Sequence, residues 1–178
     1  FPVDVSTSSR ATIGGMAGNN SAGGRSIKYG IMRDNVLSIN TILSDTSKAH
    51  FGLVKKDLSG LEDIFPKLIK IGEKSQKEIV TRFPKVLRRV GGYNLDALLP
   101  DTLASRPGST GNEKDINLSH LLVGSEGTLA YSTSVELKLS PLPPPKIMAL
   151  CHFSTFYEAM DSAQYIVKID PVAVELID

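Results

Sequence analysis

The chain has 178 residues, enough to bury a core as one ordinary domain or as two small ones. Its 20 Lys and Arg nearly cancel its 19 Asp and Glu, so composition provides no strong positive field for nucleic acid or an anionic membrane. The single cysteine, Cys151, excludes an internal disulfide, leaves too few thiolates for a zinc or iron–sulfur site in this segment, and favours a reducing, cytoplasmic compartment. No apolar run approaches the roughly 20 residues that span a bilayer, so we expect no transmembrane segment.

The first half of the chain changes from a glycine-rich to a β-rich and then to a helical pattern. Residues 1–20 show no helical period, which favours a looped segment over a core helix. In residues 35–43 we expect a strand with Leu37, Ile39 and Thr41 on one face, and residues 51–54 are the expected return strand of a hairpin. Residues 61–83 have helical spacing, and because Pro66 suggests a break or an early-turn position, we expect two short helices there.

The second half contains a predicted domain boundary. Residues 100–115 have the turn chemistry of a long surface loop. Residues 135–139 alternate apolar and charged side chains, as a half-buried strand does, and the prolines at 141–145 form a stiff connector. We therefore expect one domain over 1–143 and a second, incomplete one over 144–178, and we expect both chain ends to be cuts in a longer protein.

The segment after this boundary has a βαβ pattern. We expect a strand at 147–153, a helix at 155–167 and a second strand at 173–177. Thr155 and Glu158 have the spacing of a capping box, which predicts where the helix begins. This unit is too short to be a complete domain.

The most informative stretch is residues 11–24, which contains five glycines and three alanines. Such a segment exposes backbone N–H groups and removes side chains, which suits a phosphate or a flat ring held against main chain. The alternative is that these glycines serve only tight turns and close packing. The order of residues matches neither a P-loop nor a Rossmann fingerprint, so neither an NTPase nor a Rossmann protein is supported.

Two blocks of sequence, about a hundred residues apart, together resemble one family. The first comprises Pro2-Val3-Asp4, Ala11-Thr12-Ile13-Gly14-Gly15, Asn20-Ser21-Ala22-Gly23 and Lys28-Tyr29-Gly30. The second comprises Leu122-Val123-Gly124-Ser125-Glu126-Gly127-Thr128-Leu129, Thr133 and the exit strand Leu137-Lys138-Leu139-Ser140-Pro141-Leu142-Pro143, and between the blocks lies Gly92-Tyr93-Asn94-Leu95. These motifs resemble the second half of the FAD domain in the vanillyl-alcohol oxidase/p-cresol methylhydroxylase superfamily, in its D-lactate, glycolate and D-2-hydroxyglutarate dehydrogenase branch.

The resemblance implies an α+β fold: the second subdomain of a p-cresol methylhydroxylase-type FAD domain, with an antiparallel or mixed sheet and flanking helices, then the start of a ferredoxin-like substrate domain. It implies that FAD lies extended against this subdomain, with the Glu126 loop beside the Thr12–Gly23 stretch. The residues that we assign to FAD contact on this basis are Pro2, Asp4, Ala11, Thr12, Ile13, Gly14, Gly15, Asn20, Ala22, Gly23, Glu126, Gly127 and Tyr131.

Several of these residues also have plain structural explanations. Thr12 and Asn20 can offer hydrogen bonds and Asp4 can accept them from ribose or adenine, yet Asp4 alone suits a cap or turn equally well. Glu126 could instead be a buried acceptor that ties two loops. Tyr93 could line the flavin side or plug the core. Arg88 and Arg89 could offset negative charge on flavin or substrate, but a basic pair after a helix is typical of a solvated helix end, so we assign it no role.

The sequence also departs from the family in informative ways. Ala22 and Ala130 stand where many relatives have glycine, and the pyrophosphate loop of the first FAD subdomain is absent. The substrate-domain histidines and acidic residues that bind metal and take the proton are absent too; His50, His120 and His152 match none of those motifs. We therefore expect no metal site and name no catalytic residue in this segment.

For the intact protein the resemblance implies oxidation of a D-2-hydroxy acid to its 2-oxo acid, with hydride passing to flavin and electrons leaving to another acceptor. It is strongest with large members that carry iron–sulfur modules after the flavin part. Two alternatives stay open: a flavin- or nucleotide-binding module without turnover, and a purely structural α+β domain.

Overall fold

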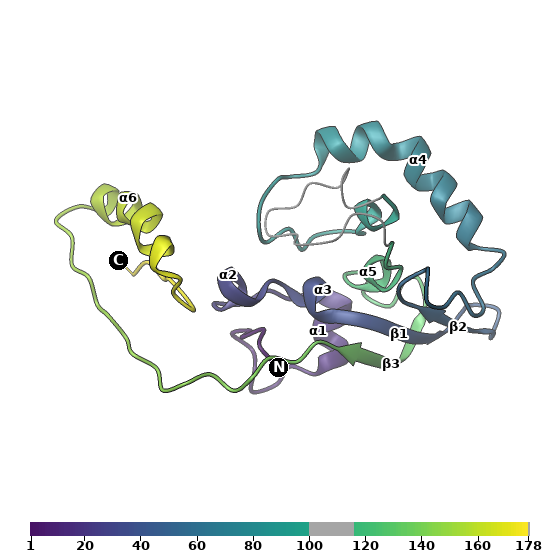
Figure 1. Ribbon diagram of the computed structural model, residues 1–178, viewed down its shortest axis with the longest axis horizontal. Helices are drawn as coiled ribbons and strands as arrows, with labels where there is room; N and C mark the ends of the chain where they lie inside the picture. Colours follow the sequence, from purple (N-terminus) through teal and green to yellow (C-terminus); the bar gives the residue numbers. More distant parts are fainter. Residues whose placement is uncertain (100–115, 178) are drawn as a thin grey trace.

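The computed structural model describes residues 1–99 and 116–177, and the loop predicted at 100–115 lies outside these residues. The chain forms several helices and one small antiparallel sheet, so the fold is α+β as predicted (Figure 1). In chain order, with η for a 3-10 helix, the elements are α1 (Ile13–Asn19), α2 (Ser26–Tyr29), α3 (Met32–Asn35), β1 (Val36–Ile42), β2 (Lys48–Phe51), α4 (Phe65–Arg82), η1 (Leu95–Leu98), α5 (Ser119–Leu122), β3 (Tyr131–Leu137), α6 (Phe156–Ile166) and η2 (Val167–Ile169).

The sheet has three strands in the order β2-β1-β3, and β1 pairs antiparallel with both neighbours. The expected hairpin is confirmed, but its return strand is Lys48–Phe51 rather than residues 51–54. The turn is short because the Leu43 amide donates to the Ser47 carbonyl at 2.9 Å and Asp45 accepts from the Ser47 amide at 3.0 Å. Pairing therefore begins three residues earlier than predicted.

The prediction that Leu37, Ile39 and Thr41 share one buried face is wrong for Leu37. Ile39 and Thr41 are 1% and 2% exposed, whereas Leu37 is 42% exposed. The register with β3 shifts between Val36 and Ser38, which is the irregularity a β-bulge produces. One extra residue in the strand reverses the alternation of faces, so Val36 is buried in place of Leu37.

The prediction of a looped segment over residues 1–20 is wrong for its last part. Ile13–Asn19 is a helix, although it contains three glycines. The Thr12 hydroxyl caps it by accepting from the Gly15 amide at 3.1 Å, and Met16 and Ala17 enter the core. Capping and burial thus outweigh the roughly 1 kcal/mol that each glycine costs a helix.

The prediction of two short helices over 61–83 is also wrong, because α4 is one continuous helix of 18 residues. Pro66 lies in its first turn, where the missing N–H group has no partner to lose. The buried side of α4 packs on η1, where a Cβ at Gly72 would lie 2.8 Å from the Leu98 Cβ.

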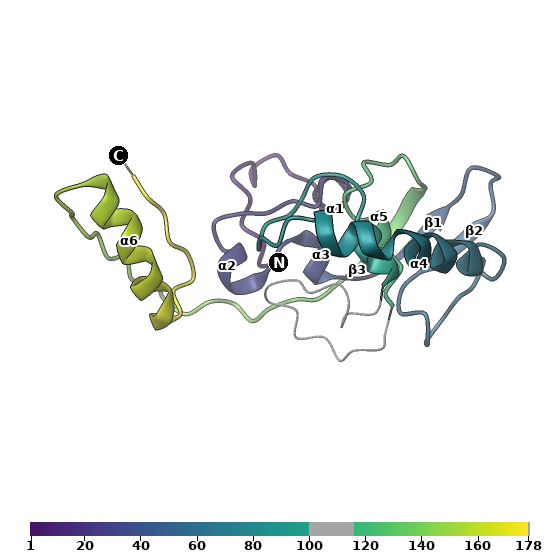
Figure 2. The same ribbon diagram turned by 90° about the horizontal axis from the view of Figure 1, so that it is seen from above.

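The segment after β3 is the least packed part of the chain. In both views an exposed connector leads from β3 to α6 at one end of the molecule (Figures 1 and 2). The predicted helix and its cap are confirmed: the Thr155 hydroxyl accepts from the Glu158 amide, and Glu158 accepts from the Ser154 amide. The strands predicted at 147–153 and 173–177 do not form, because in the described chain neither stretch has a strand to pair with.

Candidate functional site

The two motif blocks lie against each other, although a hundred residues separate them. The Gly124 amide donates to the Ala17 carbonyl at 2.9 Å, and the Glu126 amide donates to the Gly18 carbonyl at 3.0 Å. A Cβ added to Gly18 would lie 3.7 Å from the Glu126 Cα. The prediction that the Glu126 loop lies beside the glycine-rich stretch is therefore confirmed.

The glycine-rich stretch begins on the surface. Thr12, Ile13, Gly14 and Gly15 are all exposed, and a Cβ added to Gly14 would meet no atom within 4 Å. Gly14 also sits in an ordinary helical conformation, so neither packing nor backbone geometry within this chain explains a glycine there. Main chain at this position is therefore open to solvent.

The Glu126 loop is held in shape by its backbone. Glu126 and Gly127 both have positive φ angles, of 52° and 76°. The Glu126 side chain is exposed and only its main chain ties the loops together, so the alternative of a buried Glu126 acceptor is wrong. Thr128 donates its hydroxyl proton to the Ser125 carbonyl at 2.5 Å, which closes the turn.

Tyr93 joins this loop from a third segment. Its hydroxyl lies 2.8 Å from the Thr128 hydroxyl and must be the donor, because the Thr128 proton goes to Ser125. Tyr93 is 44% exposed, so the alternative that it plugs the core is wrong. The adjacent Gly91 and Gly92 have no atom within 4 Å of an added Cβ. We call the surface formed by Thr12–Gly15, Gly91–Tyr93 and Glu126–Thr128 the glycine face.

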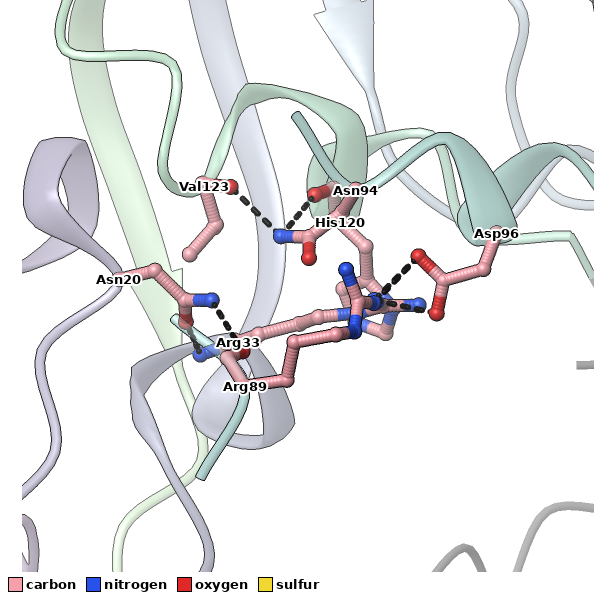
Figure 3. Close-up of polar contacts among 7 residues, drawn as sticks. All are labelled: Asn20, Arg33, Arg89, Asn94, Asp96, His120 and Val123. Carbon is pink, nitrogen blue, oxygen red and sulfur yellow. Dashed lines mark hydrogen bonds and ion pairs between the residues drawn. The ribbon is translucent and has the colours of Figure 1, made fainter. Parts of the chain in front are cut away.

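A buried polar network links the segments that carry the glycine face (Figure 3). Asn20 ends α1 in a left-handed conformation with a φ angle of 50°. Its side-chain oxygen accepts from the Arg33 amide at 3.1 Å, and its side-chain amide donates to the Arg89 carbonyl at 3.5 Å. Asn20 is 0% exposed, so against prediction its side chain faces the protein interior and not a ligand.

The centre of this network is a buried carboxylate between two guanidinium groups. Arg33 donates to both Asp96 oxygens at 2.9 and 2.8 Å, and Arg89 lies 2.6 Å from the first of them. Burial alone would raise the pKa of the Asp96 carboxyl, but the charges of Arg33 and Arg89 and their hydrogen bonds bring it below its ordinary value. Arg89 also stacks over the Phe83 ring at 4.6 Å, so it is a structural residue and not the solvated helix end that the sequence indicated.

Asn94 connects the same network to the second motif block. Its side-chain amide donates to the carbonyls of His120 and Val123, at 3.1 and 2.7 Å (Figure 3). The segment that carries Gly91 to Tyr93 is thereby fixed to α5 and to the loop that follows it. Sequence reasoning missed this whole network, because no spacing pattern connects Arg33 to residues 89–96.

The remaining predicted contact residues fall into two groups. Tyr131, which is 71% exposed, and Asp4 are open at the surface; Asp4 pairs with Arg25 at 3.1 Å with its side chain 48% exposed. Pro2 is buried, Ala11 and Ala22 are half-buried, and Gly23 is tightly packed. A Cβ at Gly23 would lie 1.8 Å from the Asp4 carbonyl oxygen, so this glycine has a packing reason of its own.

Other site types are not seen in the described residues. No group of three or more His, Cys, Asp and Glu side chains is placed to hold a metal ion within 1–99 and 116–177. Over the same residues, no helix is both long enough and apolar enough to cross a bilayer. His50 has a structural partner, since its Nδ1 lies 2.8 Å from the Asn40 side-chain oxygen.

Comparison with known proteins relates the N-terminal part of the chain to FAD binding. Residues 1–51 match the family model described as an FAD binding domain. The whole chain aligns with D-2-hydroxyglutarate dehydrogenase of Pseudomonas putida at 28% identity, with D-lactate dehydrogenase [cytochrome], mitochondrial, of Arabidopsis thaliana at 26%, and with glycolate oxidase subunit GlcD of Bacillus subtilis at 27%. It spans 17%, 22% and 27% of their lengths, respectively.

These matches confirm the predicted resemblance: residues 1–51 match an FAD binding domain, and the chain is similar to proteins named as D-2-hydroxyglutarate dehydrogenase, D-lactate dehydrogenase and glycolate oxidase. The family match covers α1, where Gly14 is exposed, and extends through β2. FAD is the cofactor indicated for this domain. Because the chain spans roughly a fifth of these relatives, the activity of the whole protein is a matter for proposal.

Proposed function

We propose that the glycine face forms one wall of the FAD site in a dehydrogenase that oxidises a D-2-hydroxy acid, of the lactate, glycolate or 2-hydroxyglutarate type, to the 2-oxo acid. The observation that carries this proposal is the open surface at Gly14, one helical turn before Gly18, which lies against the Glu126 loop. A glycine that neither packing nor backbone geometry requires is explained by a ligand that approaches main chain closely. The names of the relatives supply the class of reaction.

The residues present fit such a cofactor. In the first turn of a helix the N–H groups have no preceding carbonyl to bind, so the Ile13 and Gly14 amides are left for phosphate or ring acceptors. The Thr12 hydroxyl accepts the capping hydrogen bond from the Gly15 amide, so Thr12 would act by fixing the start of α1 beside the cofactor. The exposed Glu126, Gly127 and Tyr131 would border the same ligand, together with Asp4 of the first block. When bound, the flavin would supply the electron-accepting group of the reaction.

The buried network would act by positioning. Asn20, Asp96 and Asn94 hold the end of α1, the 89–96 segment and the loop after α5 in one arrangement. A rigid arrangement keeps main-chain groups in place before the ligand arrives, which reduces the entropy lost on binding. Their role toward FAD would therefore be indirect.

The intact protein would also need parts that this segment does not supply. We assign it a hydroxy-acid substrate, an electron acceptor, iron–sulfur modules elsewhere in the full chain and a cytoplasmic location. In this proposal residues 1–143 complete the FAD domain, and residues 144–178 begin a ferredoxin-like substrate domain.

Anaerobic reduction of the full-length protein tests this function. We expect it to purify yellow, and we expect D-2-hydroxyglutarate, D-lactate or glycolate to bleach the flavin absorbance. For D-2-hydroxyglutarate or D-lactate the matched control is the L-enantiomer, and for glycolate, which is achiral, it is acetate, which lacks the hydroxyl group. A full-length protein that never retains flavin would support the purely structural alternative, and flavin that no hydroxy acid reduces would support a binding module without turnover.

The isolated 178-residue chain provides a second test. Because it offers one wall of an extended site, it presents only part of the hydrogen bonds that FAD needs, and we expect it to keep little or no FAD through gel filtration. Stoichiometric flavin on the isolated chain would show that the glycine face is sufficient by itself, against this proposal.

A further inference from the structure

Four lysines share the outer face of α4, which runs along the outside of the molecule (Figure 1). They follow one another at intervals of three, four and three residues, and this spacing places side chains on one side of a helix. The face lies opposite the buried Gly72 and Ile79 and extends about 15 Å along the axis. We call this surface the lysine face: Lys67, Lys70, Lys74 and Lys77, all of them exposed.

The lysine face concentrates positive charge in a chain that is nearly neutral overall. Residues 67–90 contain eight Lys and Arg and only two acidic residues, Glu73 and Glu78, a net charge of +6, whereas the whole chain carries +1. The rest of the chain is therefore net acidic. This local excess is invisible in the overall composition.

No group inside the described chain uses these four charges. Glu78 pairs with Arg82 at 3.0 Å, and none of the four lysines forms an ion pair within residues 1–99 and 116–177. Like charges three and four residues apart destabilise a helix slightly. If these side chains served only to keep the protein soluble, a mixture of acidic and basic residues would stabilise the helix at least as well. Four charges of the same sign therefore favour a role in binding a negatively charged partner.

The surroundings of the lysine face favour a protein over a membrane or a nucleic acid. The apolar side of α4 is packed on η1, and its exposed Ile71 and Val80 lie nine residues apart on opposite sides of the helix, so they form no continuous apolar face that could insert into a bilayer. The helix has no exposed aromatic side chain on which a base could stack. We propose that the lysine face of α4 is a docking site for an acidic surface of a partner protein.

Charge reversal in the full-length protein tests this docking site. The test variant carries Lys67→Glu, Lys70→Glu, Lys74→Glu and Lys77→Glu. The matched control carries Lys48→Glu, Lys56→Glu, Lys138→Glu and Lys146→Glu, which changes the net charge equally at other exposed positions. The probes are a poly-L-glutamate peptide, a DNA duplex of matched charge, and vesicles of phosphatidylcholine and phosphatidylserine.

We expect the peptide to bind the unmodified protein more tightly than the duplex or the vesicles do. Reversal of the lysine face should weaken peptide binding by about tenfold or more, and the control by less than about twofold. Circular dichroism verifies folding; if the reversed variant does not fold, the four Lys→Gln changes replace it, with an expected loss of about threefold. Equal losses in test and control variants, or tighter binding of duplex or vesicles that the reversal abolishes, would overturn the docking site.

Flavin content separates this inference from the proposed function. The lysine face lies outside the glycine face, so all variants should retain as much flavin as the unmodified protein. If the charge-reversed variant loses peptide binding and retains a normal flavin content, the docking site is supported independently of the proposed function. If the unmodified protein binds the peptide but contains no flavin, the docking site is supported and the proposed dehydrogenase function is contradicted.

Discussion

Residues 1–138 and residues 139–177 follow the same local rules and reach different outcomes. In the first region strands find partners, and side chains such as Met32, Leu61 and Leu118 are 0% exposed. In the second region α6 is well capped, yet none of its residues is buried, and the predicted strands are absent (Figure 2). A helix needs only its own residues to form its hydrogen bonds, whereas a strand needs a neighbour.

The two regions meet at few points. Lys28 pairs with Asp170 at 2.6 Å, and Glu175 approaches Gly24. The Lys28–Asp170 hydrogen bond raises the pKa of Lys28, but both groups are well exposed, and solvent-exposed pairs contribute little to stability. The comparison therefore predicts that substitutions in the first region affect folding strongly and that those in the second region hardly do.

The largest effect is expected from Asp96→Ala. Removal of the carboxylate leaves Arg33 and Arg89 facing each other in a buried site, which should cost about 3–5 kcal/mol of unfolding free energy in urea denaturation of the chain. The control is Asp170→Asn, which removes the exposed charge that pairs with Lys28 at a left-handed position that Asn tolerates, and it should leave the unfolding curve unchanged. A loss for Asp96→Ala below about 1 kcal/mol would mean that the network does not organise the first region.

A smaller loss is expected from Gly23→Ala. The new Cβ would lie 1.8 Å from the Asp4 carbonyl oxygen, so the backbone must shift, at about 1–3 kcal/mol in the same measurement. The neighbouring Gly24→Ala is the control, because its Cβ would meet only the Glu175 side chain at 3.1 Å, which can move. Similar losses at both positions would show that the second region is held more firmly than its contacts indicate.

Gly14→Ala is expected to have opposite effects on stability and on flavin. In the isolated chain it should stabilise the fold by about 0.5–1 kcal/mol, since alanine favours a helix and nothing lies within 4 Å. In the full-length protein the same methyl group would intrude on the glycine face, and the flavin-to-protein absorbance ratio should fall. Stabilisation together with full flavin content would remove Gly14 from the proposed site.

The smallest effect is expected from ending the chain at Lys138. Because the second region buries so little, the thermal midpoint of the remaining chain should change by no more than that of Gly24→Ala. Within residues 1–99 and 116–177, limited proteolysis of the 178-residue chain should correspondingly cut first in the exposed connector at residues 139–153. A midpoint that drops markedly on truncation would show that α6 stabilises the first region.

The candidate site was only partly readable from the sequence. Thr12–Gly15 and Glu126–Gly127 stand out because their unusual composition is local. Asn20 looked like a ligand contact because an amide in a glycine-rich loop suits one, but its place at the end of α1 turns it inward. Asp96 is 63 residues from Arg33 in the sequence, and nothing in the spacing predicts that they pair.

The sequence by itself determined whatever depends on neighbouring residues: the Thr155 cap, the hairpin, the early-turn place of Pro66 and the two motif blocks. Only the tertiary structure decided which side chains are buried, which strands and charged groups are paired, and where a helix continues without a break. The bulge that exposes Leu37, the continuous α4, the inward Asn20 and the ion pairs of Asp96 all follow from contacts between distant segments. Local hydrogen bonds can be read from order along the chain, whereas burial and charge pairing depend on what the fold brings into contact.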